Sequence, residues 1–355
     1  MKFGILFAGQ GAQQAGMGLD FLSDPLFKET IDQASQACGL DLPEIWKNDH
    51  GQLDETRYVQ PALVAFEYGI WQMLVRDTDL PVCGLAGLSL GEYGALLASG
   101  CLTWPAGLAL VVDRGEYMQL DSEKTASGML ALTKPDLPGL EDFLRAKQAA
   151  GQAVYLANYN SPKQVVLAGE KQLLPELDQE IADRKLAKRA IPLDVAGAFH
   201  TPLYQAASRK MGQRLKNETF AAGTYPVISN STCQPFAKED LAKILEVQLM
   251  VPTHFDACVK GLLDLGMTAS LEIGPGHALS AFAKQADKGL QTWQVGSLAE
   301  YQQFVEEEQN GFTKEAGPGD RVNARNRGSN CLGFCAKGLP GALKWPAAGI
   351  AGGNR

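Results

Sequence analysis

A short apolar run followed by a glycine-rich turn recurs in this chain of 355 residues and constrains its fold more than any other feature. The apolar runs cover residues 3–8, 82–86 and 269–273. The turns after them are Gly9-Gln10-Gly11, Gly87-Leu88-Ser89-Leu90-Gly91 and Gly274-Pro275-Gly276. Segments with helical spacing of apolar residues lie between the runs, and strands that alternate with helices are typical of a mostly parallel sheet. We therefore expect an α/β domain.

Residues 124–196 show a different order of elements. We expect helices at 140–150 and 171–184, a turn at 158–162, and strands at 129–132, 154–157, 165–168 and 190–195. The order β-α-β-β-α-β is the split βαβ arrangement. It predicts a small antiparallel sheet inserted into a larger domain, which then consists of residues 1–123 and 197–300.

Two prolines predict where helices begin. Gln60-Pro61 precedes a helical apolar pattern, and a proline suits the first turn of a helix. Thr201-Pro202 predicts a second helix start, with Thr201 as the N-cap and Pro202 as the first helical residue.

Composition and charge exclude several classes of protein. Hydrophobic residues make up 45% and charged residues 20% of the chain, as in a globular protein with a sizeable core. No stretch approaches the roughly 20 apolar residues of a membrane-spanning helix. The net charge of −8 argues against nucleic acid as a partner. Residues 309–355 hold seven basic and two acidic residues, a charge of +5, which leaves −13 for residues 1–308.

The N-terminus and the cysteines indicate the compartment. The apolar run at residues 3–8 is too short for the core of a signal peptide. Five cysteines are scattered through residues 1–308 without the Cys/His spacing of a metal site. We expect reduced thiols, no bound metal and a cytoplasmic location.

The segment Gly87-Leu88-Ser89-Leu90-Gly91 fits the pattern G-x-S-x-G between an expected strand and an expected helix. Such a turn exposes a serine hydroxyl and needs a small residue on both sides. Ser89 is therefore the candidate nucleophile, and the N–H of Leu90 is a candidate oxyanion donor at a helix N-terminus. The Gly9-Gln10-Gly11 loop is a candidate second donor. The alternative is a plain glycine turn with a capping serine.

A serine nucleophile needs a base, and His200 and His277 compete for that role. The order Ser89, an acid such as Asp256 or Asp264, and His277 matches that of α/β-hydrolases. His200 instead lies in a loop before an expected helix, and spacing alone leaves both open.

Arg114 lies in an apolar helical stretch. It is either a residue at the rim of the helix or, if it points toward Ser89, a grip for an acidic acyl group, because a guanidinium binds a carboxylate through two hydrogen bonds.

Seven ordered motifs resemble the family of malonyl-CoA:acyl carrier protein transacylases, which load malonyl units in bacterial type II fatty acid synthesis. The resemblance runs from about residue 3 to about residue 300. Its motifs are the segments 7–13, 60–62, 87–93, 114–118, 158–162, 198–201 and 274–276.

The resemblance implies a hydrolase-like α/β domain with an inserted ferredoxin-like subdomain. It implies Ser89 as the nucleophile that carries the acyl ester and His200 as its base, oriented by the backbone carbonyl of Gln248. It places the oxyanion donors at Gln10 and Leu90 and the malonyl-binding guanidinium at Arg114. Gln60 and Asn160 belong to the supporting site. Leu88 stands where the family often has histidine, and Phe199 matches the malonyl-selective version.

The implied partners are malonyl-CoA and acyl carrier protein, and no cofactor is expected beyond the phosphopantetheine of the carrier. Because the carrier is acidic in this family, docking needs a local basic patch on the acidic body. Two clusters qualify: Arg184, Lys185, Lys188 and Arg189, and then Arg209, Lys210, Arg214 and Lys216. We expect a monomer. The alternatives are an acyltransferase that serves a polyketide synthase, an acyl-thioester hydrolase and, with least support, a non-catalytic subunit.

Residues 309–355 lack a helical or strand period and contain ten glycines. We expect an irregular, disordered tail without a core. Read one nucleotide out of frame, the codons of residues 317–335 permit a sequence that resembles the start of a short-chain ketoacyl reductase, whose gene commonly follows that of the transacylase. A frameshift would explain the segment, and the coding DNA decides.

Overall fold

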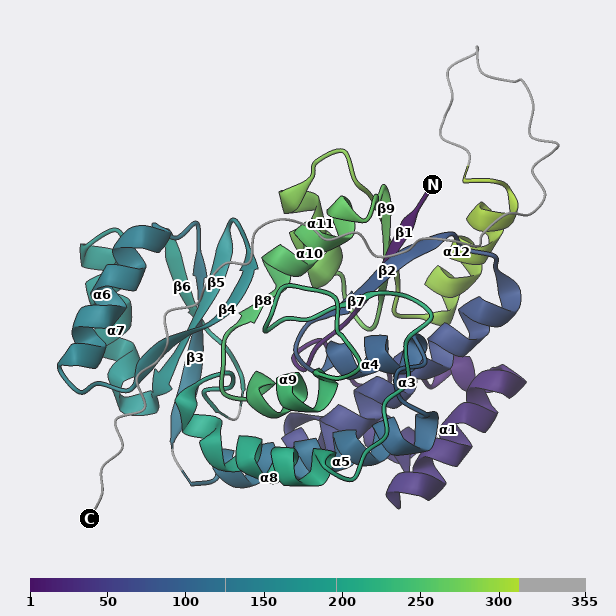
Figure 1. Cartoon of the computed structure of the whole chain (residues 1–355), viewed down its shortest axis with the longest axis horizontal. Coiled ribbons are helices and arrows are strands. Elements are labelled where there is room, and N and C mark those ends of the chain that lie inside the picture. The colour runs from purple at the N-terminus through teal and green to yellow at the C-terminus, as the bar shows by residue number, and fades with distance from the viewer. Residues whose placement is uncertain (125, 196, 313–355) are drawn as a thin grey trace, which may run out of the picture. The chain divides into compact units, whose positions relative to one another are not determined.

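The computed structural model describes residues 1–124, 126–195 and 197–312. Among these residues, five parallel strands form the main sheet in the order β10-β9-β1-β2-β7 (Figure 1). Their bounds are β1 (Phe3–Phe7), β2 (Val82–Gly87), β7 (Val227–Ile228), β9 (Ala269–Ile273) and β10 (Gln291–Val295). This confirms the mostly parallel α/β sheet expected from the recurring turns. The first strand, β1, lies at its centre.

The side chains of β1 alternate between two apolar clusters, one on each face of the sheet, and helices cover both faces. Phe3, Ile5 and Phe7 belong to one cluster, and Leu6 belongs to the other. The helices of the main domain are α1 (Pro25–Cys38), α2 (Leu42–Lys47), α3 (Thr56–Asp77), α4 (Gly91–Ala98), α5 (Trp104–Ser122), α8 (Gln205–Leu215), α9 (Leu241–Gln248), α10 (Phe255–Asp264), α11 (Ala278–Ala286) and α12 (Leu298–Gln309). Short 3-10 turns occupy Asp20–Ser23, Gln52–Asp54, Lys171–Leu173 and Pro202–Tyr204.

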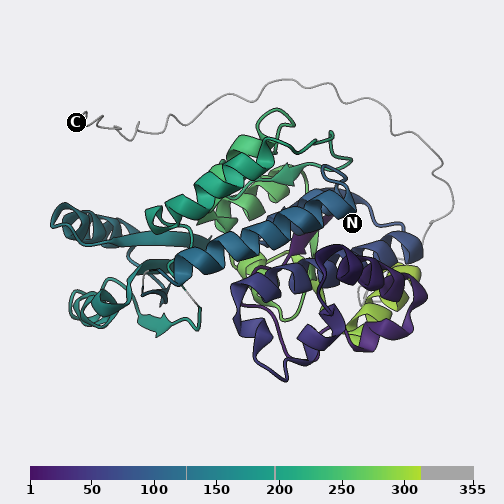
Figure 2. The same cartoon turned by 90° about the horizontal axis from the view of Figure 1, so that it is seen from below.

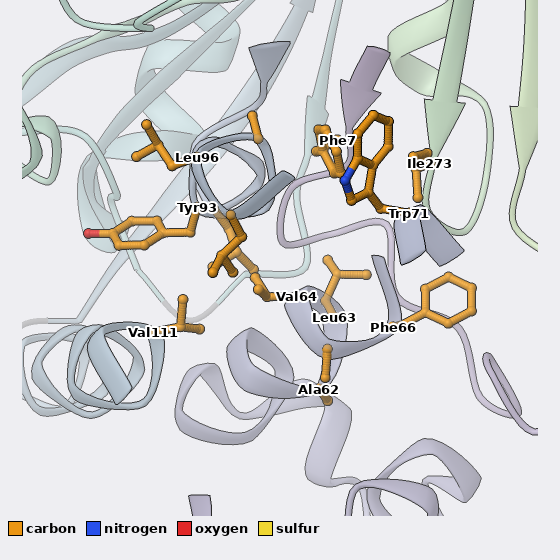
Figure 3. Packing of buried hydrophobic residues seen from close by; sticks show 14 of the residues in the cluster. Phe7, Ala62, Leu63, Val64, Phe66, Trp71, Tyr93, Leu96, Val111 and Ile273 are labelled. Carbon is orange, nitrogen blue, oxygen red and sulfur yellow. The ribbon is translucent and has the colours of Figure 1, made fainter. Parts of the chain in front are cut away.

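The larger cluster packs α3, α4 and α5 against one face of the sheet. Figure 3 shows Phe7 of β1 beside Trp71 of α3, whose ring centroids are 6.4 Å apart. Tyr93 of α4 and Val111 of α5 belong to the same cluster. On the other face, α10 and α11 contribute residues such as Phe255 and Leu279. The sheet is therefore covered by apolar packing on both faces.

The inserted subdomain has its own sheet and its own core. Its elements are β3 (Ser127–Thr133), α6 (Leu137–Ala149), β4 (Val154–Ser161), β5 (Gln164–Glu170), α7 (Leu174–Asp183) and β6 (Arg189–Pro192). The strand order is β6-β3-β5-β4, and each of these neighbouring pairs is antiparallel. Figure 2 shows this sheet with its two helices beside the main domain. The ferredoxin-like insert is thus confirmed.

The main domain adds one strand to the inserted sheet. Residues of β8 (Thr253–His254) pair in parallel with Asn158 and Tyr159 of β4. The side-chain amide of Asn158 donates to the hydroxyl of Thr253 at 2.7 Å. This junction attaches a segment of the main domain to the edge of the inserted sheet, which the sequence pattern did not predict.

Several expected boundaries were wrong. Helix α3 begins at Thr56, so Pro61 lies inside it, where it removes only one backbone donor near the helix start. Residues 158–161 belong to β4 rather than to a turn, and the last strand of the insert ends at Pro192. Thr201 does cap a helical turn, accepting from the Leu203 N–H at 3.4 Å, but that turn is 3-10 and α8 begins at Gln205.

The main domain also extends beyond residue 300. Helix α12 ends at Gln309, and the ring of Phe312 packs 5.2 Å from that of Phe3 and 5.1 Å from that of Trp293. Residues 309–312 are therefore part of the folded body rather than of an irregular tail. The rest of the proposed tail, residues 313–355, lies outside the described residues. Within the described part of the chain, no helix is long and apolar enough to cross a membrane.

Candidate active site

Ser89 lies on a strained turn between the end of β2 and the start of α4. Its φ angle is +55°, in the left-handed region that side chains other than glycine rarely adopt. A Cβ atom added to Gly87 would lie 1.9 Å from the carbonyl carbon of Gly91, and one added to Gly91 would lie 2.2 Å from the carbonyl oxygen of Phe7. Both glycines are therefore required for the chain to turn this sharply.

Asn230, directly after β7, holds this turn in place. Its side-chain oxygen accepts the N–H of Ser89 at 2.7 Å, and its side-chain nitrogen donates to the carbonyl of Gly87 at 2.7 Å. Asn230 is completely buried. It lies 141 residues from Ser89 in the sequence, and sequence reasoning missed it.

His200 lies next to the serine hydroxyl. Its Nε2 atom is 2.6 Å from the Oγ of Ser89, and its Nδ1 is 2.9 Å from the backbone carbonyl oxygen of Gln248. A carbonyl only accepts hydrogen bonds, so Nδ1 carries the proton and Nε2 is free to accept one from the serine. Burial, together with the nearby charge of Arg114, lowers the pKa of His200 to about 4. The neutral base is therefore the resting form at neutral pH.

The loop that carries His200 is tied to its surroundings by hydrogen bonds. The hydroxyl of Thr201 donates to the carbonyl of Ala198 at 2.7 Å, and the N–H of Ala198 donates to the hydroxyl of Ser127 at 3.0 Å. His200 itself has a φ angle of +60°. These contacts stabilise the unusual backbone conformation of His200, which a loop without them would not keep.

The competing histidine does not reach the nucleophile. His277 is exposed at the N-terminus of α11, and Asp264 is exposed at the end of α10. The structure thus brings His200, and not His277, to Ser89, and a carbonyl rather than an aspartate contacts its second ring nitrogen.

Arg114 is a buried residue of the cleft rather than a rim residue. Its side chain is 0% exposed. One guanidinium nitrogen donates to the side-chain oxygen of Gln60 at 2.8 Å. The other donates to the Oγ of Ser89 at 3.2 Å and to the side-chain oxygen of Gln248 at 3.1 Å. All three hydrogen-bond partners are neutral, and the nearby negative group, the buried Glu92, interacts with the guanidinium through its charge.

Leu90 directly follows Ser89, and the loop of Gln10 lies against the same turn. Leu90 is buried at the N-terminus of α4, where helix N–H groups point outward. Gln10 follows β1, and its side chain links Thr56 and Gln60 through two hydrogen bonds of 3.2 Å. A Cβ atom on Gly9 would lie 2.4 Å from the carbonyl oxygen of Leu88, so the loop of Gln10 passes directly over the serine turn.

A cavity of about 280 Å³ joins these groups. Ser89, His200, Arg114 and Gln10 line its polar part, and Leu88 and Phe199 contribute apolar wall. The insert supplies a further wall, which includes Asn160 and Met129. The side-chain nitrogen of Asn160 donates to Gln164 at 2.8 Å, while its oxygen has no partner. Sequence reasoning missed Met129 and, on the opposite wall, Phe282 and Glu272, because ordinary core positions give no motif.

Comparisons with known proteins agree with this arrangement of the site. The family model described as "Acyl transferase domain" matches residues 5–314. A malonyl CoA-acyl carrier protein transacylase of Bacillus subtilis is 33% identical over 294 residues, which cover 82% of this chain and 92% of that protein. Its counterpart from Synechocystis is 36% identical, with coverage of 84% and 98%.

Solved structures agree with this family. A transacylase structure from Streptococcus pneumoniae superimposes with a TM-score of 0.81 at 38% identity, and covers 86% of this chain and 99% of that one. A malonyl-transacylase solved together with a type II polyketide acyl-carrier protein superimposes with a TM-score of 0.82 at 30% identity, with coverage of 86% and 100%. With the serine turn, the histidine and the buried arginine in one cavity, the chain belongs to the acyltransferase family of malonyl-CoA:acyl carrier protein transacylases.

Proposed function

We propose that this enzyme transfers malonyl from malonyl-CoA to the phosphopantetheine thiol of an acyl carrier protein through a malonyl-serine intermediate. The observation that carries the proposal is the juxtaposition in one cavity of a serine–histidine pair and a buried guanidinium, with Arg114 only 3.2 Å from the Oγ of Ser89. A nucleophile beside a fixed positive charge suits an acyl group that ends in a carboxylate.

In the first half-reaction, Nε2 of His200 takes the proton of Ser89 while Oγ attacks the thioester carbonyl. Backbone N–H groups of Leu90 and Gln10 stabilise the developing oxyanion. The C–S bond then breaks, and His200 returns its proton to the thiolate of the departing coenzyme A. In the second half-reaction, His200 takes the proton of the carrier thiol, whose sulfur attacks the malonyl ester. The ester C–O bond then breaks, and His200 returns its proton to the Oγ of Ser89.

The charge of Arg114 couples substrate binding to the base. Burial and that charge together lower the pKa of His200. A malonyl carboxylate bound to the guanidinium compensates this charge, so His200 becomes a stronger base once malonyl is in place. An acetyl group lacks this effect and also the ionic contact.

A radiolabelled malonyl-CoA assay tests the proposal. Native enzyme should incorporate label into protein and then lose it to carrier protein, whereas Ser89→Ala should incorporate none. Labelled Ser89→Ala protein would refute the assignment of the nucleophile. Release of label as free malonate at the same rate with and without carrier protein would instead identify a thioester hydrolase.

We place carrier docking at a basic hollow of the inserted subdomain. The hollow has a volume of about 490 Å³ and is lined by Lys134, Lys185, Lys188 and Arg189 together with Asp178. The rival cluster on α8 is less available, because Arg214 already forms ion pairs with Asp113 and Glu218. The hollow suits the acidic surface that carrier proteins of this family present.

Some relatives are named for polyketide biosynthesis, so the second candidate function is malonyl transfer to a polyketide carrier protein. One from Bacillus velezensis is 31% identical over 277 residues. The ratio of kcat/KM for a fatty-acid carrier and a polyketide carrier distinguishes the two roles, because the chemistry at Ser89 is the same. Function without a bound cofactor, a cytoplasmic location and a monomeric state stay predictions.

A further inference from the structure

The carboxylate of Glu92 lies beneath the active site. It connects the residue that holds the Ser89 turn, Asn230, with the residue that contacts His200, Gln248. Glu92 is the second residue of α4, and its side chain is 0% exposed. One carboxylate oxygen accepts the backbone N–H of Asn230, and the other accepts the side-chain amide of Gln248. These partners lie 138 and 156 residues away in the sequence, on segments that otherwise belong to different parts of the fold.

Both partners of Glu92 contact catalytic groups. Asn230 holds the N–H of Ser89 and the carbonyl of Gly87, each at 2.7 Å. Gln248 contacts His200 through its backbone carbonyl at 2.9 Å and the carbonyl of Ser89 through its side-chain nitrogen at 2.9 Å. Displacement of either partner would therefore shift the serine relative to the histidine.

The position requires an acceptor rather than any polar residue. Two N–H donors point at the two oxygens of Glu92, and an ionised carboxylate accepts at both without offering a hydrogen of its own. A glutamine of the same size would direct an N–H₂ group at one of the donors. We propose that Glu92 is a positioning residue which, through Asn230 and Gln248, sets the contact between Ser89 and His200; this inference rests on the proposed malonyl transfer.

Several ionisable groups face this carboxylate. Arg114 of α5 attracts the charged form, while Tyr93 of α4, Cys258 of α10 and Cys233 lie within electrostatic range. Burial outweighs the arginine and raises the pKa of Glu92 to about 7. Protonation places an O–H opposite one of the two donors, so one contact is lost. Activity should thus rise as the pH passes upward through about 7, which the base His200, with its pKa of about 4, does not explain.

Glu92→Gln tests the proposal. Acylation of Ser89 should slow at least about tenfold, because small displacements of reacting groups reduce rates steeply. We expect this loss with malonyl-CoA and also with p-nitrophenyl acetate, a probe that needs the serine–histidine pair but no malonyl site. The ratio of malonyl to acetyl transfer should change far less than the rate of acylation, since Arg114 keeps its contact with Gln60. The rise in activity near pH 7 should disappear from the variant.

Glu67→Gln is the matched control. Glu67 is also fully buried, on the adjacent helix α3, and its carboxylate forms no hydrogen bond to Asn230, Gln248 or Ser89. This variant should acylate Ser89 at close to the native rate. A urea titration of both variants identifies any loss of folding. If Glu92→Gln does not fold, Glu92→Asp replaces it: the shorter acidic side chain keeps two acceptors but cannot reach both donors, so partial loss is expected.

Two results would overturn the proposal. One is native acylation rates in folded Glu92→Gln and Glu92→Asp. The other is a pH profile of the native enzyme with no change between pH 6 and pH 8. If native enzyme reacts with p-nitrophenyl acetate in a Glu92-dependent manner but fails to transfer malonyl, the proposed function fails while the positioning role stands.

Discussion

The main domain and the insert contribute different things to the same cavity. The main domain supplies Ser89, His200, Arg114 and Gln248, which are joined by hydrogen bonds of 2.6–3.2 Å. The insert contributes wall residues such as Met129 and Asn160, whose partners lie within its own sheet or in the apolar core. The catalytic groups therefore belong to the main domain, and the insert supplies part of the cavity wall.

This division follows from how each part is held. Ser89 follows the carboxyl end of the buried strand β2, and the catalytic groups of the main domain hydrogen-bond to one another, so small shifts are costly. The basic side chains of the hollow in the insert are exposed, so salt screens their charges. Changes in the main domain should therefore reduce kcat, whereas changes in the insert should alter KM for the carrier.

Replacement of the base should have the largest effect. His200→Ala removes the acceptor for the serine proton, so both half-reactions should slow by about 10²- to 10⁴-fold. Single-turnover labelling of Ser89 by malonyl-CoA measures the first step, and transfer of label to carrier protein measures the second. Loss of only one half-reaction would contradict a single shared base.

Arg114→Ala should change selectivity more than turnover. A hydrogen-bonded contact to a charged group contributes about 1.5–3 kcal/mol, so malonyl transfer should fall about 10- to 100-fold relative to acetyl transfer. Competition between malonyl-CoA and acetyl-CoA measures the ratio. Arg114→Lys keeps the charge but loses the bidentate hydrogen bonding of the guanidinium, so we expect an intermediate ratio of malonyl to acetyl transfer. An unchanged ratio in the alanine variant would remove Arg114 from the malonyl site.

The serine turn could be predicted from sequence because its determinants are local. Gly87 and Gly91 are demanded by backbone contacts within a few residues and from the neighbouring strand β1, so the pattern itself carries the geometry. The order of strands and helices in the insert was predictable for the same reason. Pro61 misled because a proline tolerated in a first turn is also tolerated slightly further into a helix that packs well.

The choice of base and the contact of Arg114 with Ser89 could not be predicted from local pattern. His200 meets Ser89 across 111 residues, and Arg114 meets Gln248 across 134. The apolar residues three and four positions away, such as Leu110, Val111 and Met118, put Arg114 on the buried face of α5, but periodicity does not show that its guanidinium reaches Ser89. Such contacts depend on how α5, α9 and the loop of His200 pack, and only the fold reveals them.

Substitutions in the main domain should also reduce the free energy of unfolding more than substitutions in the insert. Asn230→Ala leaves the N–H of Ser89 and the carbonyl of Gly87 unpaired in the interior, at a cost of about 1–3 kcal/mol for each group. Asn160→Ala, at an insert position where one side-chain atom already lacks a partner, should cost about 1 kcal/mol or less. Urea unfolding measures both free energies. Equal losses of unfolding free energy in the two variants would contradict the idea that the stabilising polar contacts are concentrated beneath Ser89.

The smallest effect should come from the basic hollow. Lys188→Glu should raise KM for carrier protein by roughly fivefold, because one exposed charge contributes at most about 1 kcal/mol, while KM for malonyl-CoA and kcat stay near native values. Lys210→Glu, which reverses an exposed charge on α8, is the matched control and should change neither constant. Added salt should reduce the difference between Lys188→Glu and native enzyme, since the attraction is screened. A larger effect of Lys210→Glu would move the docking site to α8, and the insert would then act only as a wall of the cavity.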